Sequence, residues 1–210
     1  MLGIFKEKLV NPPQELNSPE SLNSSKRNSN PKSFGNDALL AYSPSNKPSI
    51  HQENECALSF ISHSHAKVSH RFCVLDNIYC IFLGSLNNLS KLIKRYDLSK
   101  GTNEAMFIIE AYRTLRDRSP YPADQVLKEL EGSFGFVIYD HKDATVFTAL
   151  VQHVVFEQGS DGKIGFFWGI AADGSVVMSE NLELIKGSCG KSFAPFPTRC
   201  MFHSANGLMS

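Results

Sequence analysis

From residue 72 onward the chain alternates short apolar runs with polar turns, a pattern typical of β-hairpins. Residues 72–75 and 78–83 are apolar, and the Asp76-Asn77 pair between them favours a two-residue hairpin turn. Two further pairs of runs follow, at residues 132–140 and 144–151 and at residues 164–170 and 175–179. The pattern therefore predicts three antiparallel hairpins, and a last strand is expected around residue 201.

The stretch between the first two hairpins has helical spacing instead. Residues 89–96 carry apolar side chains three and four positions apart behind an asparagine cap, which predicts an amphipathic helix. A second helix is predicted from residue 104 to 118, with arginines in its last turn and Pro120 after it. Shorter helices are expected at residues 122–130 and 180–185. Helices grouped between two sets of hairpin strands predict an α+β fold in which antiparallel sheets are sandwiched with helices.

Residues 11–50 differ from the rest of the chain in composition. Of these 40 residues, 22 are Ser, Asn or Pro, so too few apolar side chains remain to offset the entropy of ordering the segment. An apolar pentamer at residues 38–42 is the exception and is compatible with one short strand. We therefore expect a single domain over residues 1–210 with a flexible insertion at about 11–50.

Composition excludes several classes of function. Lys and Arg number 21 and so do Asp and Glu, so no positive excess is present to bind nucleic acid or an anionic membrane. No apolar run approaches the ~20 residues of a membrane span, and the first eight residues do not resemble a signal peptide. Five cysteines without a Cys-x-x-Cys pair predict free thiols, no metal site and no cofactor. The expected location is the cytoplasm, the nucleus or both.

Three arginines near the end of the second predicted helix form a candidate anion-binding patch. Arg113, Arg116 and Arg118 present guanidinium groups that bind carboxylate or phosphate well. The alternative is a helix end stabilised by its own dipole and by an Arg–Asp pair. Sequence leaves both interpretations open.

Four patches, in order, resemble the class II glutamine amidotransferases, which are N-terminal nucleophile hydrolases. Residues 1–5, Met-Leu-Gly-Ile-Phe, resemble the family's opening Met-Cys-Gly-Ile-Phe. Residues 81–88 resemble its strand ending in Asn-Gly-Glu-Ile-Tyr-Asn, with Leu83 in place of the first asparagine. Residues 102–104 are similar to its Asp-Thr-Glu helix start, and residues 130–140 to its Leu-x-Gly-x-Phe-Ala-Phe-x-x-x-Asp strand.

The resemblance is closer to a plant family, the aluminium-induced or stem-specific proteins with YGL and LRDR motifs. Leu115-Arg116-Asp117-Arg118 matches LRDR, whereas the YGL position has Tyr96-Asp97-Leu98. Other matching stretches are residues 109–114, 120–126 and 189–197. Residues 151–158 resemble an insertion, and the chain ends sooner than expected of the family; a splice variant would account for both.

The resemblance implies that catalysis has been lost. An N-terminal nucleophile enzyme needs a thiol or hydroxyl on its first residue once Met1 is removed, because that residue's own amine serves as the base. Leu2 has neither group, and a leucine so placed does not favour removal of Met1. Leu83 also lacks the amide donor of an oxyanion hole, a loss of ~3 kcal/mol. What remains is a candidate vestigial ligand pocket at Gly84, Thr102 and Asn103.

We therefore expect a non-catalytic amidotransferase-like protein, a binding or regulatory module in a plant stress or hormone response. Its expected ligand is glutamine or another small anion, and homodimerisation is expected as well. One alternative is residual glutamine amidohydrolase activity. Another is a purely structural scaffold that dimerises through a sheet edge or through the aromatic patch around Trp168.

Overall fold

The computed structural model describes residues 1–11, 16, 49–52, 56–60, 69–117, 128–152 and 164–210. These fall into two compact units, Met1–Ser62 with Gly165–Pro197 and His63–Ile164 with Thr198–Ser210. Each unit contains one six-stranded sheet in which every pair of neighbouring strands is antiparallel. The α+β class with antiparallel sheets is confirmed, and the expectation of a single domain stays a prediction.

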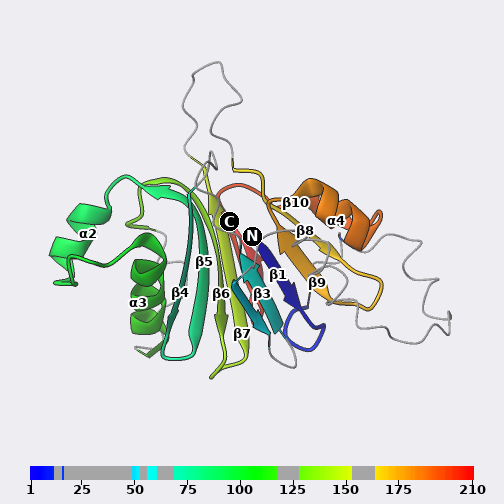
Figure 1. Cartoon of the computed structure of the whole chain (residues 1–210), viewed down its shortest axis with the longest axis horizontal. Coiled ribbons are helices and arrows are strands. Elements are labelled where there is room, and N and C mark those ends of the chain that lie inside the picture. Colours follow the sequence, from blue (N-terminus) through cyan, green and yellow to red (C-terminus); the bar gives the residue numbers. More distant parts are fainter. Residues whose placement is uncertain (12–15, 17–48, 53–55, 61–68, 118–127, 153–163) are drawn as a thin grey trace, which may run out of the picture. The chain divides into compact units, whose positions relative to one another are not determined.

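The first unit, unit 1, is built around the N-terminal strand. Its elements are β1 (Leu2–Phe5), β2 (Ser49–Gln52), β3 (Cys56–Phe60), β8 (Phe167–Ile170), β9 (Val176–Ser179), α4 (Leu182–Cys189) and β10 (Phe193–Pro195). The strand order is β10-β8-β9-β1-β3-β2, so β1 lies inside the sheet between β9 and β3. Helix α4 packs on β8 and β9 (Figure 1). The helix expected at 180–185 begins later, at Leu182, because the Asn181 side chain caps it by accepting the N–H groups of Glu183 and Leu184. It also runs further, to Cys189.

The second unit, unit 2, contains the longer strands. Its elements are β4 (His70–Leu75), β5 (Ile78–Leu86), α2 (Leu89–Arg95), α3 (Glu104–Asp117), β6 (Gly132–Asp140), β7 (Thr145–Val151), β11 (Cys200–His203) and β12 (Gly207–Met209). The order is β12-β11-β7-β6-β5-β4. Asp76 and Asn77 have φ of 50° and 62°, as expected of the two-residue turn that the sequence predicts.

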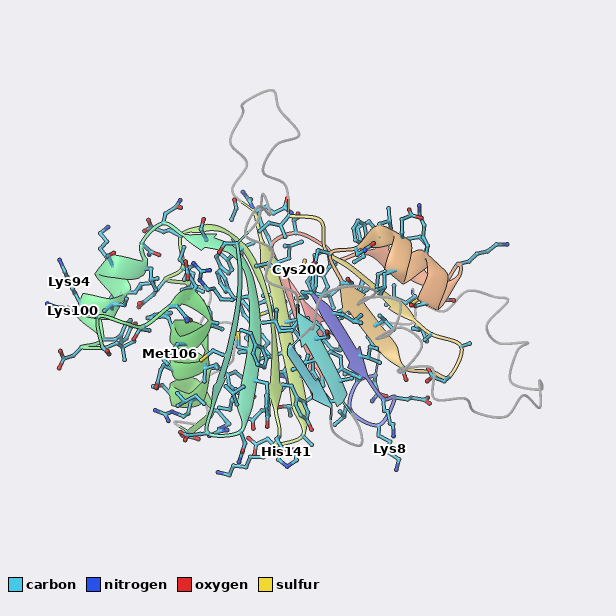
Figure 2. All side chains as sticks on the ribbon, in the orientation of Figure 1. Lys8, Lys94, Lys100, Met106, His141 and Cys200 are labelled. Carbon is cyan, nitrogen blue, oxygen red and sulfur yellow. The ribbon has the colours of Figure 1, made fainter. Side chains whose placement is uncertain are left out.

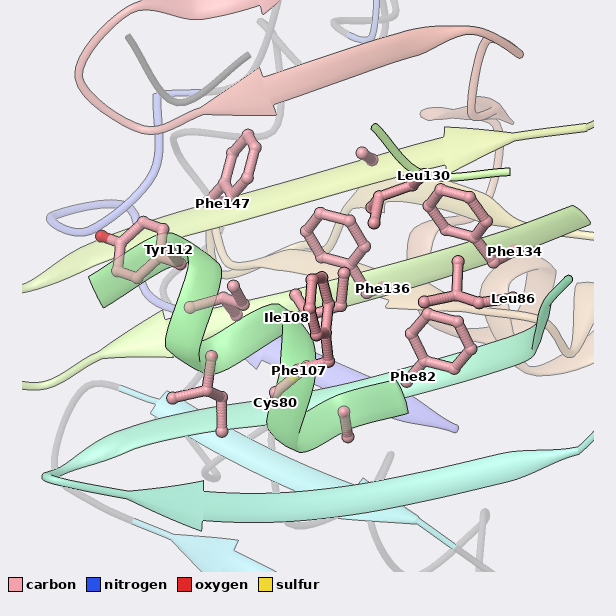
Figure 3. Close-up of a cluster of buried hydrophobic side chains, with 14 of the residues drawn as sticks. Cys80, Phe82, Leu86, Phe107, Ile108, Tyr112, Leu130, Phe134, Phe136 and Phe147 are labelled. Carbon is pink, nitrogen blue, oxygen red and sulfur yellow. The ribbon is translucent and has the colours of Figure 1, made fainter. Parts of the chain in front are cut away.

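Aromatic packing holds α3 on the sheet of unit 2. The helix lies along β4 and β5 (Figure 1). Phenylalanines from the helix and three strands gather beneath it, among them Phe82, Phe107, Phe134 and Phe136 (Figure 3). The rings of Phe82 and Phe134 stack with centroids 5.7 Å apart, an arrangement that adds to the free energy gained from burial. This core holds α3 in place on the sheet. The candidate residues Thr102 and Asn103 lie just before the helix, and Arg113 and Arg116 lie near its end.

Several predicted features lie outside the described residues. They are most of the insertion at 11–50, the strand at 38–42, most of the helix at 122–130, Arg118 and most of the stretch at 151–158. Within the part of the chain that the structure describes, no helix is long and apolar enough to cross a membrane.

Candidate functional site

The N-terminal strand β1 begins at Leu2, the residue that the sequence resemblance aligns with a catalytic nucleophile. In the register of the sheet, Leu2 lies directly opposite Ser59 of β3 and Ser179 of β9, so these three side chains share one face. Leu2 is fully buried and belongs to an apolar cluster with Val177 and with Ile185 of α4. The hydroxyl of Ser59 is buried beside it and has no hydrogen-bond partner among the described residues. The position is therefore enclosed, and its side chain is an aliphatic core residue.

The amine that precedes Leu2 is also held in place. The α-amine of Met1 forms an ion pair and hydrogen bond with the carboxylate of Glu180. The Met1 carbonyl accepts a hydrogen bond of 2.6 Å from the Ser179 hydroxyl, which in turn accepts the N–H of Asn181 at 3.1 Å. Burial lowers the pKa of the Met1 amine below its usual value, while Glu180 acts in the opposite direction. Met1 is thus bound through its amine to Glu180 and through its carbonyl to Ser179, which are residues that lead from β9 into α4.

The backbone around position 84 in unit 2 requires glycine. Its φ is +93°, and a Cβ at this position would lie 2.2 Å from the carbonyl oxygen of Ser133. Only glycine therefore fits without a shift of β6. Its N–H donates to the carbonyl of Ser69 at 2.9 Å, and the neighbouring Leu83 is fully buried. The N–H that could have served as an oxyanion donor is already committed to the β4–β5 pairing.

Thr102 and Asn103 serve the start of α3. The side-chain oxygen of Asn103 accepts the N–H of Met106 at 2.9 Å, which is the geometry of a helix N-cap. Thr102 is buried, and its N–H donates to the carbonyl of Ser99 at 3.0 Å. Both residues thus have a local structural role. Together with Gly84 they belong to unit 2, whereas Leu2 belongs to unit 1.

The two described arginines of the predicted anion patch are each held by carboxylates. Arg116 donates to the fully buried carboxylate of Asp140 at 2.6 Å and to Asp117 at 2.9 Å. The hydrogen bond to Asp117 is the main reason why the pKa of Arg116 lies above its usual value. Arg113, one turn earlier, pairs with Asp76 and donates to Glu110 at 2.7 Å. The two side chains tie the end of α3 to the β6–β7 and β4–β5 turns, respectively.

Unit 1 has an open surface cavity of about 270 Å³ that no local sequence pattern predicts. It is lined by Lys6, Glu7, Lys8, Asp173 and Ser175. The first three follow β1 directly, and Lys8 projects beyond the end of that strand (Figure 2). Neither lysine forms an ion pair with any residue that the structure describes. The one sequence signal was the charge alternation Lys-Glu-Lys after an apolar strand, which is common in solvent-exposed turns.

The aromatic patch around Trp168 is buried. Trp168 and Phe166 are 3% and 2% exposed, and the rings of Trp168 and Phe196 meet edge to face with centroids 4.9 Å apart. These side chains therefore act as core residues, and they do not form an exposed aromatic surface. Among the described residues, no cluster of three or more His, Cys, Asp or Glu side chains has the arrangement of a metal site.

Comparison with known proteins decides the family. A family model described as "Aluminium induced protein" matches residues 2–210. The chain belongs to the aluminium induced protein family. It is also 36% identical over 165 residues to the stem-specific protein TSJT1 of Nicotiana tabacum, covering 71% of this chain and 99% of that protein.

Residues 96–98, which the sequence analysis compared with a YGL motif, end helix α2. Tyr96 ends α2, Asp97 follows with a φ of +51°, and Leu98 donates its N–H to the carbonyl of Ile93 and packs against the core. A left-handed residue followed by an apolar one is the usual end of a helix, and glycine is the residue that this conformation favours. Residues 96–98 therefore end α2, and Leu98 anchors that end to the core. The left-handed position is occupied by Asp97, for which this conformation is strained.

Replacing Asp97 with glycine is expected to stabilise unit 2 by about 0.5–1 kcal/mol, because glycine adopts the left-handed conformation without steric cost. Urea unfolding followed by circular dichroism measures the change. Asp97→Ala is the matched control, since it removes the same carboxylate and keeps the Cβ. A glycine variant no more stable than the alanine variant would contradict the explanation.

Proposed function

We propose that this protein is a non-catalytic relative of the class II glutamine amidotransferases that acts as a binding or regulatory module. The observation that carries the proposal is Leu2, which stands where the nucleophile would be and is fully buried in an apolar cluster. A leucine offers no thiol or hydroxyl to attack an amide. No other residue of β1 supplies such a group either.

Two further observations support the loss of catalysis. The N–H of Gly84 donates to Ser69, and the side chain of the buried Leu83 has no amide group, so neither of the two expected oxyanion donors is available. The α-amine of Met1 is engaged by Glu180. The base, the nucleophile and the oxyanion donors would all have to be restored before an amide could be hydrolysed.

The proposed ligand is glutamine or another small anion, bound in the cavity of unit 1. Lys6 and Lys8 supply two ammonium groups for a carboxylate, while Glu7 and Asp173 supply carboxylates for an amine. Arg113 and Arg116 are weaker candidates because Asp76, Glu110, Asp117 and Asp140 already occupy their donors. We place the protein in the cytoplasm or nucleus of a plant cell, in a stress or hormone response and as a homodimer.

Two measurements on the full chain test this proposal. Incubation with glutamine is expected to release no ammonia above a buffer blank, and calorimetric titration is expected to show saturable heat at millimolar glutamine, which corresponds to ~4 kcal/mol of binding. Ammonia release that scales with protein concentration would overturn the non-catalytic assignment. The absence of heat from a folded chain would overturn glutamine as the ligand.

A matched pair of variants locates the binding. The double variant Lys6→Gln and Lys8→Gln is expected to lose the heat, because the ligand carboxylate loses both ammonium partners. Lys186→Gln removes one charge elsewhere in unit 1, on α4, and is expected to bind as the wild type does. Equal binding by both variants would exclude the cavity as the site.

A further inference from the structure

Two of the five cysteines lie directly opposite each other on neighbouring strands. Cys73 of β4 is in register with Cys80 of β5, and two residues on each strand separate this pair from the Asp76-Asn77 turn. The other cysteines have no such neighbour: Cys56 pairs with Phe5, Cys200 pairs with Leu150, and Cys189 lies in α4. All five are free thiols in the structure.

The register fixes the separation of the two cysteines. Gly84 donates its N–H to Ser69, so this pair is of the hydrogen-bonded type, and the pairs two and four residues further along each strand are of the same type. Cys73 and Cys80 are such a pair, for which the Cα atoms lie about 5.5 Å apart. Disulfides span Cα separations of about 4.4–6.8 Å, so a bond between these two residues needs no change of register. It does require the two Cβ atoms to move from about 5 Å apart to the roughly 3.5–4.5 Å of a disulfide.

The two sulfur atoms lie on the same side of the sheet but differ in exposure. Cys80 is fully buried in the core beneath α3 (Figure 3), and Cys73 packs against the same core from the edge strand β4. Cys73 is only partly buried. Burial raises the pKa of the Cys80 thiol, and Cys73 is close enough to add to the rise. A small oxidant therefore reaches Cys73 first, with Cys80 next to it.

We propose that Cys73 and Cys80 are an oxidation site that forms a reversible disulfide across β4 and β5 when the protein meets a hydroperoxide. The Cys73 sulfur attacks one peroxide oxygen, the O–O bond breaks, and a sulfenic acid and one water or alcohol result. The Cys80 sulfur then attacks the sulfenic sulfur of Cys73, and the S–O bond breaks. The released hydroxide takes up the Cys80 proton and leaves as water. Two thiols are oxidised by two electrons, and the peroxide is reduced.

The burial of the two thiols makes this oxidation slow, and the register of β4 and β5 limits the disulfide to Cys73 and Cys80. Burial raises the pKa of the Cys73 thiol, Glu110 on α3 adds to the rise, and the pKa of Cys80 is shifted further by its complete burial. Since the thiolate is the reactive form, both thiols persist without sustained oxidant. The bond would fasten the edge strand β4 to its neighbour and remove two thiols from the core beneath α3.

Peptide mapping tests the proposal on the wild-type chain. The reduced protein is treated with hydrogen peroxide, free thiols are blocked, and the denatured protein is cut with trypsin and with a protease that cleaves before aspartate. The two cysteines then fall in separate peptides, residues 72–75 and 76–91. We expect these peptides to remain linked after oxidation and to separate when a dithiol is added.

Variants at matched positions complete the test. Cys200→Ser removes another partly buried thiol and is expected to retain the full yield of linked peptide, whereas Cys73→Ser is expected to lose it. Cys80→Ala, checked for folding by circular dichroism, is expected to stop at the Cys73 sulfenic acid, which a dimedone-type reagent traps. Irreversible oxidation of Cys73 without linkage in the wild type, or linkage to a cysteine other than Cys80, would overturn the proposal.

Discussion

Replacing Arg116 with alanine is expected to lower the free energy of unfolding by about 3 kcal/mol, because it leaves a buried carboxylate without its cation. Asp140 is fully buried and accepts the Arg116 guanidinium at 2.6 Å. It also accepts the backbone N–H groups of Lys142 and Asp143, at 3.0 and 3.4 Å, but these do not neutralise its charge. Urea unfolding gives the total loss. Hydrogen exchange is expected to show faster exchange in α3 and in the β6–β7 hairpin.

Arg113 supplies the matched control for this prediction. It lies on the same helix one turn earlier and also bridges to a hairpin turn, but its partner Asp76 is 59% exposed. Exposed ion pairs contribute little, so Arg113→Ala is expected to cost less than about 1 kcal/mol. Similar losses of unfolding free energy for the two variants would show that the burial of Asp140 does not increase the contribution of Arg116 to stability.

Replacing Leu2 with cysteine is expected to yield a chain that begins at the new cysteine and still releases no ammonia from glutamine. A small second residue favours removal of Met1, so both a thiol and a free α-amine would arise at the nucleophile position. The thiol would lie between the hydroxyl-bearing residues Ser59 and Ser179. Catalysis would nevertheless lack its oxyanion donors, because the Gly84 N–H is bonded to Ser69 and the Leu83 side chain carries no amide group. Intact mass and an ammonia assay provide the two measurements.

Leu2→Ala is the control for this experiment. It also favours removal of Met1 but adds no thiol, and it costs about 2–5 kcal/mol because Leu2 is fully buried. Ammonia release by the cysteine variant above that of the alanine variant would mean that only the nucleophile has been lost. In that case the proposal of a decayed oxyanion hole fails, while the wild type remains without a nucleophile.

Features that depend on neighbouring residues could be predicted from the sequence. The Asp76-Asn77 turn, the α3 start at Asn103 and the alternating strands that flank the turns all follow from local patterns, and the structure contains them. The short-range rules for hairpins and caps hold at these positions because each involves only a few consecutive residues. The asparagine cap expected before residue 89 is wrong, because the Asn88 side chain donates to the Glu129 carbonyl and accepts the Glu131 N–H instead of capping α2. That position 2 carries an aliphatic side chain without a thiol or hydroxyl is equally visible in one residue.

Features that depend on distant residues could not be predicted. The partner of Arg116 is 24 positions away, and nothing in residues 115–118 identifies Asp140 as its acceptor. The bond from Gly84 to Ser69 depends on the register of β4, and the cavity depends on Asp173 approaching a turn far earlier in the chain. Local periodicity carries no information on such pairings. The role of the arginines and the presence of the pocket therefore could not be predicted from the sequence.

The division of unit 1 between the two ends of the chain affects its synthesis on the ribosome. β1 is translated before the other elements of the unit, but one of its two neighbours, β9, ends only at Ser179. At about 5–20 residues per second, the strand that carries Leu2 waits roughly 10–35 s for that neighbour. Throughout this interval one edge of an apolar strand is open to wrong pairing. The nascent chain is thus exposed to aggregation at β1, and chaperones that bind this strand before β9 is made would have their greatest effect there.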